Sequence, residues 1–374
     1  MSAGALVGEF AVPFYGALLC VAPVATKPTV QFGVRIPPER TGATVIRAQR
    51  RAYFKRTAVI GVCCTVMAVL LAVHGPRWAP ILVVPIEIAA DVGCLLVARR
   101  KIAAVKRAEH WFVGLRPTVV ADTSWRADPP RFPVRWLIPA LTVTAATVLI
   151  GVLRYPELPG RLTDGFGAWA APGHRVPKTP VTAFALVFAQ LWVTALWTAM
   201  MLIIYRSRPD IEAADPAASV RRYRRFLARC TMAMLTLVTL IDLSLLLAAL
   251  RNWQVYRLAG AGAALPLLPY AVGLLAFVTL ILRSGQGGFR LPADGPDDGR
   301  AADPARRPGL ADRDDDRFWK GGLIYVNRDD PALMVGARFG VGWTFNLANP
   351  AAWLLLSAIA GVPAGLVIIA VLTR

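Results

Sequence analysis

The sequence predicts an all-α polytopic membrane protein with about eight transmembrane helices and a small cytoplasmic β-meander before the last helix. Three observations support this fold class. Hydrophobic residues make up 56% of the 374 residues, whereas a soluble domain carries roughly 45–50% apolar residues. They gather in runs of about twenty residues, the length that crosses roughly 30 Å of hydrocarbon. Lys and Arg concentrate in every second connection between these runs.

The apolar runs should all be helices, because backbone in lipid must satisfy its own hydrogen bonds. The first run lacks a basic n-region and is interrupted by Glu9, so we expect a retained span and no cleaved signal peptide. The predicted spans are residues 4–26, 57–74, 79–98, 134–153, 181–205, 227–250, 258–282 and 351–372.

The distribution of positive charge predicts the orientation. The basic connections are 27–56, 99–133, 206–226 and 283–350, and they alternate with connections poor in Lys and Arg. The positive-inside bias then places both termini outside a bacterial cell membrane. Arg clusters beside the spans should contact anionic lipid head groups. Topology explains the net charge of +19, and without an RNA-binding signature or zinc finger we expect no nucleic-acid partner.

The chain divides into five predicted regions, and two of them lie outside the bilayer core. A Gly-, Pro-, Asp- and Arg-rich linker cannot bury a core, and a β-module follows it. The regions are 1–153 (four spans and the cytoplasmic "FGVRIP" loop), 154–282 (an extracytoplasmic loop and three spans), 283–317 (a disordered linker), 318–350 (the cytoplasmic β-module) and 351–374 (the last span).

The β-module is predicted from three strand-like runs, "GLIYV", "ALMVGAR" and "GWTFNLA", separated by turn residues. A three-stranded meander is marginal alone, so we expect it to dock on other cytoplasmic segments. "VQFGVRIP" at 30–37 and "ARFGVGWT" at 337–344 share Phe-Gly-Val. Either residues 30–36 add a strand to this sheet, or the match is a coincidence. Residues 42–56 are expected to form a basic amphipathic helix at the interface.

The outside loop, residues 154–179, is rich in Pro, Gly and aromatic residues and short of helix or strand periodicity. A loop of this length exceeds what a connection between spans needs. It either binds a component outside the cell or forms a compact cap over helix ends.

Four acidic residues fall inside predicted spans: Glu9, Glu87, Asp91 and Asp242. A carboxylate in lipid costs roughly 2.5–3.5 kcal/mol on insertion scales, so such groups normally face a bundle interior. Glu87 and Asp91 are four residues apart and therefore share a helix face. They either line a proton or cation path, or they are neutral acids that hydrogen-bond between helices, with Gln190 as a candidate partner.

No feature of the sequence predicts an enzyme. No Walker loop, HExxH, GxSxG or dinucleotide fingerprint is present. The five cysteines form no CxxC pair and the three histidines lie far apart, so we expect no catalytic residues, no cofactor and no metal.

Two segments carry family resemblances. In the outside loop, a Tyr-Pro-x-Leu-Pro start is followed by a turn and a closing Lys, at Tyr155, Pro156, Leu158, Pro159, Phe166 and Lys178. This pattern resembles domain of unknown function 1648 (DUF1648), which implies a ligand surface that we extend to Trp169. The family's usual His-aromatic-Asn triplet is replaced here by Gly165, Phe166 and Gly167.

The second resemblance lies in the C-terminal segment, at positions that include Trp319, Tyr325, Asn327, Asp330, Pro331, Gly340, Gly342, Trp343 and Asn346. Their pattern resembles domain of unknown function 5808. Arg328 departs from that pattern, where Pro is usual. Sdp-type immunity proteins, relatives of the first family, protect a cell from a secreted peptide toxin and can relay its presence to a repressor.

Two functions follow as expectations. The first is a non-enzymatic sensor or immunity-like protein, whose outside loop meets a secreted peptide or envelope component and whose cytoplasmic module contacts a regulator. The alternative is an ion-coupled transporter or channel that uses Glu87, Asp91 and Asp242.

Overall fold

A computed structural model describes residues 12–76, 79–118, 128–163, 175–207, 209–212, 216–256, 265–292, 310–312, 314–359 and 361. It is mostly helical, and five of its helices are long and apolar enough to cross a membrane. This agrees with the predicted class of helical membrane protein. The five are Thr44–His74, Val134–Glu157, Ala185–Arg206, Pro216–Asn252 and Leu265–Gly288.

The other three predicted spans are not confirmed as such. The first is described only as α2 (Val12–Ala25), because Glu9 and its neighbours lie outside the described residues. The third is helical, as α4 (Val83–Ala108), but it carries Glu87 and Asp91. The last is described as a short apolar helix, Pro350–Ile359. Eight crossings therefore stay a prediction.

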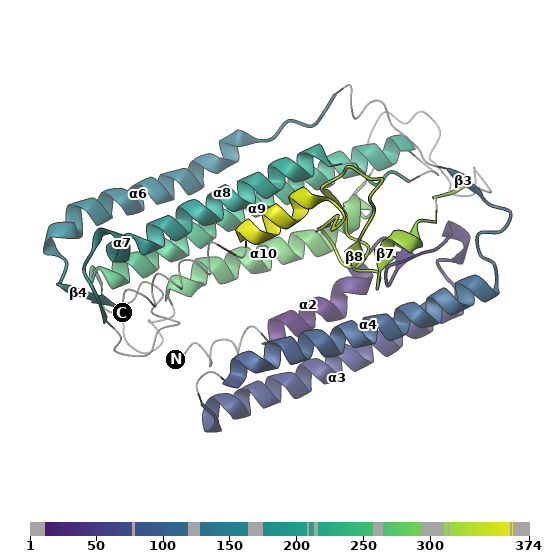
Figure 1. Ribbon diagram of the computed structural model, residues 1–374, viewed down its shortest axis with the longest axis horizontal. Coiled ribbons are helices and arrows are strands. Elements are labelled where there is room, and N and C mark those ends of the chain that lie inside the picture. Colours follow the sequence, from purple (N-terminus) through teal and green to yellow (C-terminus); the bar gives the residue numbers. More distant parts are fainter. Residues whose placement is uncertain are drawn as a thin grey trace.

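The helices form two units (Figure 1). In the first helical unit, α3 (Thr44–His74) packs against both α2 and α4. In the second helical unit, α9 (Pro216–Asn252) is central and contacts α6 (Ile138–Arg154), α8 (Ala185–Arg206) and α10 (Leu268–Ser284). The two units meet where α2 touches α10. Short 3-10 helices are η2 (Pro38–Arg40), η3 (Ala79–Leu82), η4 (Val134–Leu137) and η5 (Tyr155–Glu157).

Two of the helices extend well beyond their apolar parts. The basic segment 44–56 continues without a break into the apolar part of α3, so the separate interfacial helix predicted over residues 42–56 is wrong. The start of α9 likewise contains the "RRYRR" run. Charged side chains on the first turns let such helices project past the hydrocarbon. Farther along α3, exposed apolar side chains such as Val62 form the surface expected to face lipid.

Segments predicted to share one side of the membrane do gather at one end of the helices. The hairpin β1 (Val30–Gln31) and β2 (Val34–Arg35), the end of α4 and the C-terminal module lie together there. At the opposite end, β4 (Arg161–Thr163) pairs with β5 (Arg175–Pro177) and is followed by α7 (Pro180–Ala183). The outside loop thus contains a strand pair that its sequence pattern did not indicate.

The C-terminal module, residues 318–350, is built from two hairpins instead of the predicted three-stranded meander. Its first hairpin pairs β7 (Trp319–Lys320) with β8 (Ile324–Tyr325), and its second pairs β9 (Met334–Gly336) with β10 (Trp343–Phe345). Gly321 and Gly322, with φ of 62° and 80°, permit the tight first turn. A single bridge between Tyr325 and Asn346 joins the hairpins.

Residues 30–36 do not add a strand to this module, which corrects the strand-addition hypothesis. They close on themselves as β1–β2, because Phe32 and Gly33 adopt positive φ of 50° and 72° in a two-residue turn. Such turns match the twist of short hairpins. The tip of this hairpin nevertheless touches the module, since the ring of Phe32 stacks on Phe339 at 6.1 Å.

The predicted linker 283–317 is folded at both of its ends. After α10, η7 (Gln286–Gly288) leads to the buried side chain of Leu291. At the other end, β6 (Leu310–Asp312) pairs in parallel with β3 (Arg116–Thr118), and η9 (Asp316–Phe318) leads into the module. Residues 293–309 lie outside the described part.

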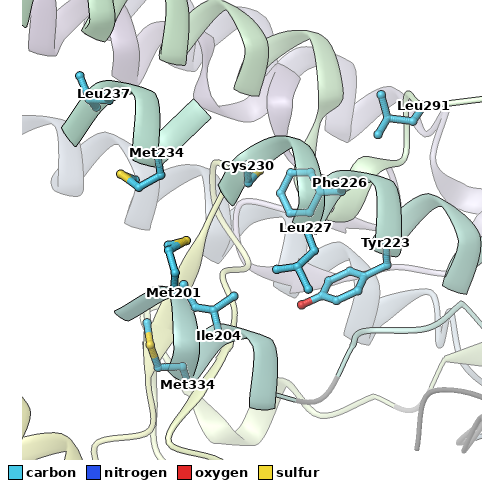
Figure 2. Packing of buried hydrophobic residues seen from close by; sticks show 10 residues of the cluster. All are labelled: Met201, Ile204, Tyr223, Phe226, Leu227, Cys230, Met234, Leu237, Leu291 and Met334. Atoms are coloured by element: carbon cyan, nitrogen blue, oxygen red, sulfur yellow. The ribbon is translucent and has the colours of Figure 1, made fainter. Parts of the chain in front are cut away.

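The C-terminal module connects the cores of both units. Its Met334 joins buried residues of α8 and α9, among them Met201, Phe226 and Leu227 (Figure 2). On the other side, its Phe339 packs against the first unit's buried cluster. Burial of apolar side chains in two separate cores holds the module between the units.

Candidate functional site

Glu87 and Asp91 form the first candidate site, inside the first helical unit. Their spacing on α4 places both side chains on one face, and they are 0% and 2% exposed. None of their four carboxylate oxygens has a hydrogen-bond partner among the described residues. Because an unpaired buried charge is strongly unfavourable, this arrangement favours carboxyl groups that hold a proton or pair with a cation.

Two glycines make room for Glu87. A Cβ atom on Gly16 of α2 would lie 2.6 Å from Glu87 Oε1, and one on Gly61 of α3 would lie 3.6 Å from it. The backbones of α2 and α3 therefore form a notch that admits the carboxyl group. A larger residue at position 16 would push this side chain away.

Asp242 belongs to a different site, in the second helical unit, so the acids do not form one group; Glu9 lies outside the described residues. Asp242 of α9 is 0% exposed and accepts a hydrogen bond at Oδ2 from Thr194 Oγ1 of α8 (2.8 Å). The Gln190 amide donates to the Asp242 carbonyl oxygen (2.8 Å) and to Thr147 Oγ1 of α6 (3.0 Å). The expected bond between an acid side chain and Gln190 is therefore not seen: Gln190 contacts the backbone of Asp242, and Thr194 contacts its carboxylate.

The described residues of the predicted outside-loop surface mostly hold the base of the loop together. Lys178 Nζ donates to the carbonyl oxygens of Tyr155 (3.2 Å) and Leu158 (3.0 Å), and lies 5.0 Å from the Tyr155 ring centroid. Leu158 is buried in a cluster that includes Trp253. Pro156 and Pro159 flank these contacts, and Phe166 and Trp169 lie outside the described residues.

Most motif residues of the C-terminal module are structural. Tyr325 donates to Asp330 (2.9 Å) and accepts from Asn327 (3.1 Å), while burial raises the pKa of Tyr325 to about 12. Asn346 donates to the carbonyl oxygens of Asn327 and Asp330, both at 2.9 Å. These bonds hold the connection between the hairpins, in which Pro331 lies.

Other motif residues attach the module to the helical units. Gly340 and Gly342 have positive φ, and their N–H groups donate to Thr26 Oγ1 (2.8 Å) and Gln286 Oε1 (2.7 Å). Trp343 donates through its ring nitrogen to the Tyr223 hydroxyl (3.3 Å). The module is therefore fixed to α10 and α9, and to the segment after α2.

A charge network, which we call the clasp, was not predicted from the sequence. Arg338 of the module, 3% exposed at its side chain, pairs with Asp315 and Asp316. Other pairs in the clasp are Lys27–Asp210 (2.8 Å), Arg35–Asp210 (3.7 Å), Arg35–Asp315 (3.2 Å), Lys106–Asp314 (2.7 Å) and Lys106–Asp316 (2.7 Å).

Within the clasp, the pKa values of Lys27, Asp210 and Asp316 are shifted in the direction that favours their charged forms. Burial alone would lower the pKa of Lys27, but Asp210 and Glu212 outweigh burial and raise it. Burial alone would raise the pKa of Asp316, yet Arg338 and Lys106 hold it below its usual value. The pKa of Asp210 is also lowered, by Lys27 and Arg35 against the effect of burial. Lys27, Asp210 and Asp316 are therefore charged at neutral pH.

A polar cavity of 420 Å³ lies beside the clasp, between the units and the module. Four basic and four acidic side chains line it, including Lys27, Asp210 and Arg338. The Trp319 ring also lines it, and its buried Nε1–H has no hydrogen-bond partner among the described residues. The volume suits a small molecule, and the balanced charge favours no ligand of one sign.

No group of three or more His, Cys, Asp and Glu side chains that could hold a metal ion occurs in the described part of the chain. The polar groups that do converge are carboxyl, amide and hydroxyl oxygens inside the helices. Such oxygens suit protons and hard cations.

A comparison with protein-family models finds one match. Residues 328–353 match the model described as a family of unknown function, DUF5808. No curated protein and no solved structure matches the chain. The resemblances of the outside loop to DUF1648 and to Sdp-type immunity proteins stay predictions. The described structure and this match together identify a helical membrane protein whose C-terminal module is similar to the DUF5808 family.

Proposed function

We propose that this protein is an ion-coupled transporter or channel in which Glu87 and Asp91 carry protons. The observation that supports this best is the complete burial of both carboxyl groups with no hydrogen-bond partner among the described residues. Acids that served only to join helices would be hydrogen-bonded to a neighbouring helix. Intramembrane acids of this kind mark ion pathways and proton relays in many membrane proteins.

The notch supplies a second argument. Gly16 and Gly61 leave space where ordinary side chains would pack, and Glu87 fills it.

Proton flux into liposomes tests the proposal. The purified full-length chain is reconstituted with an entrapped pH-sensitive dye, and a potassium diffusion potential drives proton entry. We expect wild-type flux above that of empty liposomes and at least a tenfold loss in the double variant Glu87→Gln, Asp91→Asn. Glu39→Gln, an exposed acid in the same unit, is the matched control. A double variant that retains wild-type flux, or a wild type no faster than empty liposomes, would contradict the proposal.

The double variant should fold, because neither side chain has a hydrogen-bond partner to lose among the described residues. Replacing each acid by its neutral amide keeps the volume that fills the notch. Thermal unfolding and size-exclusion elution of the purified variant check this directly.

The second candidate is the non-enzymatic sensor or immunity-like protein. It is favoured by the module, which contacts both units around a polar cavity. A ligand bound there, or a peptide met by the outside loop, would change how the units are joined. In cells exposed to such a peptide, Phe166→Ala and Trp169→Ala should remove protection if this candidate is right, whereas Glu87→Gln with Asp91→Asn should leave it intact.

A further inference from the structure

The second helical unit contains a group of oxygen atoms that the proton pathway does not use. Three of them are buried and have no hydrogen-bond partner in the described structure: Asp242 Oδ1, Gln190 Oε1 and Thr144 Oγ1. The exposed fractions of these residues are 0%, 0% and 5%. Buried polar atoms without partners are rare in folded proteins and call for a ligand or a proton.

Hydrogen bonds fix Gln190 and Asp242 relative to each other. The two N–H donors of Gln190 are used by Thr147 Oγ1 and by the Asp242 carbonyl oxygen, so its side-chain oxygen is left without a donor. Thr194, one turn from Gln190 on α8, donates a hydrogen bond to Asp242 Oδ2. The other carboxylate oxygen, Oδ1, has no hydrogen-bond partner among the described residues. Three helices thus hold the acceptors in place.

Thr144 lies on the face of α6 that Gln190 contacts through Thr147. It lies three residues before Thr147 on the buried face of α6, and residues at this spacing share a helix face. Its neighbours Thr142 and Thr147 donate to the carbonyl four residues earlier, each at 2.8 Å. Thr144 makes no such bond, so its hydroxyl is available to another partner.

Two arrangements would satisfy the three oxygens: a protonated Asp242 acting together with the hydrogen of the Thr144 hydroxyl, or a bound cation. A protonated Asp242 donates one hydrogen bond and can satisfy one acceptor. A cation coordinates several oxygens at once, and the single carboxylate of Asp242 would balance a single positive charge. Carboxylate, amide and hydroxyl oxygens are the ligands that hard cations take.

We propose that Asp242, Gln190 and Thr144 bind a monovalent alkali cation inside the second helical unit, with Thr194 orienting the carboxylate. The site goes beyond the proton pathway of the first unit and rests on its own geometry. It gives the protein a second ion, held by different helices.

Equilibrium binding of radioactive sodium to the purified full-length chain tests this site. We expect saturable binding in the wild type, no measurable binding in Asp242→Asn, and roughly tenfold weaker binding in Thr144→Val. Thr142→Val, exposed on the same helix, is the matched control and should bind as the wild type does. Sodium should also raise the unfolding temperature when it replaces choline at constant ionic strength, and this rise should be lost in Asp242→Asn.

Absence of saturable sodium, lithium or potassium binding in the wild type would overturn the proposal, as would wild-type binding in Thr144→Val and Asp242→Asn together. Thr144→Val keeps the test decisive if Asp242→Asn fails to fold. The variant Glu87→Gln, Asp91→Asn should bind sodium normally, because its acids lie in the other unit. Loss of proton flux and loss of sodium binding are therefore separate results.

Discussion

Substitution of Gly33 by alanine should detach the C-terminal module from the first helical unit. A Cβ atom at position 33 would lie 2.5 Å from Gly322 Cα and 2.6 Å from the Gly322 carbonyl oxygen, both backbone atoms that cannot rotate away. Gly33 also has a φ of 72°, which side-chain-bearing residues rarely adopt. The positive φ costs about 1–2 kcal/mol, and overpacking adds about 1–3 kcal/mol.

The sum is about 2–5 kcal/mol, and each 1.4 kcal/mol changes an equilibrium constant tenfold. Hydrogen exchange of residues 318–346 should therefore be faster by roughly thirty-fold or more in Gly33→Ala. Gly42→Ala is the matched control, because no atom lies within 4 Å of its added Cβ and its φ is not positive. Equal exchange rates in the two variants would refute the packing argument.

Three further predictions concern the clasp and the loop base. Arg338→Met removes one of two buried basic partners from each of Asp315 and Asp316, while Arg35 and Lys106 remain. It should lower the free energy of unfolding by about 1.5–3 kcal/mol in chemical denaturation, whereas exposed Arg317→Met should change it by less than about 0.5 kcal/mol. The pKa values of Asp210 and Asp316 are lowered in the folded protein, so their ion pairs stabilise it fully above about pH 4. This stabilisation is lost as the pH falls through the lowered pKa values, and tryptophan fluorescence should then report release of the module. Unchanged fluorescence in acid would argue against the clasp. Lys178→Met removes two charged hydrogen bonds and should speed hydrogen exchange in β4 and β5 without affecting the module. The loss of local stability should be at most about 1.5–3 kcal/mol for each bond.

The sequence predicted the helical membrane class well because hydrophobic length is a local property. The runs at 134–153 and 181–205 lie within or nearly within candidate spanning helices. It also predicted which connections share one end, because Lys and Arg content is read directly from each loop. The segment 42–56 was predicted wrongly, since amphipathic composition does not reveal whether a helix continues into its neighbour.

The site was predicted only in part, for a physical reason. Glu87 and Asp91 could be placed on one face from their spacing, but the notch formed by Gly16 and Gly61 depends on how three helices pack. The clasp was missed because Asp315 and Asp316 lie in a segment whose composition is typical of a linker. Long-range ion pairs leave no periodic signal in the chain.

Strand pairing in the module shows the same limit. Three of its four strands were found from apolar runs, but β7 is only two residues long and was not predicted. The chain turns at Gly321 and Gly322, so β8 pairs with β7, and not with β9 as the predicted meander required. The strand β9 pairs with β10. A strand this short is specified by its turn and by the burial of Trp319 more than by any pattern of its own.

Infrared spectroscopy tests most directly whether Glu87 and Asp91 hold protons within the helices. At neutral pH, the wild type should show a carbonyl stretching band of protonated carboxylic acid that resists hydrogen–deuterium exchange, as expected for groups at most 2% exposed. That band should be absent from the spectrum of the Glu87→Gln, Asp91→Asn variant. A wild-type spectrum without such a band, or an unchanged band in the variant, would contradict the account.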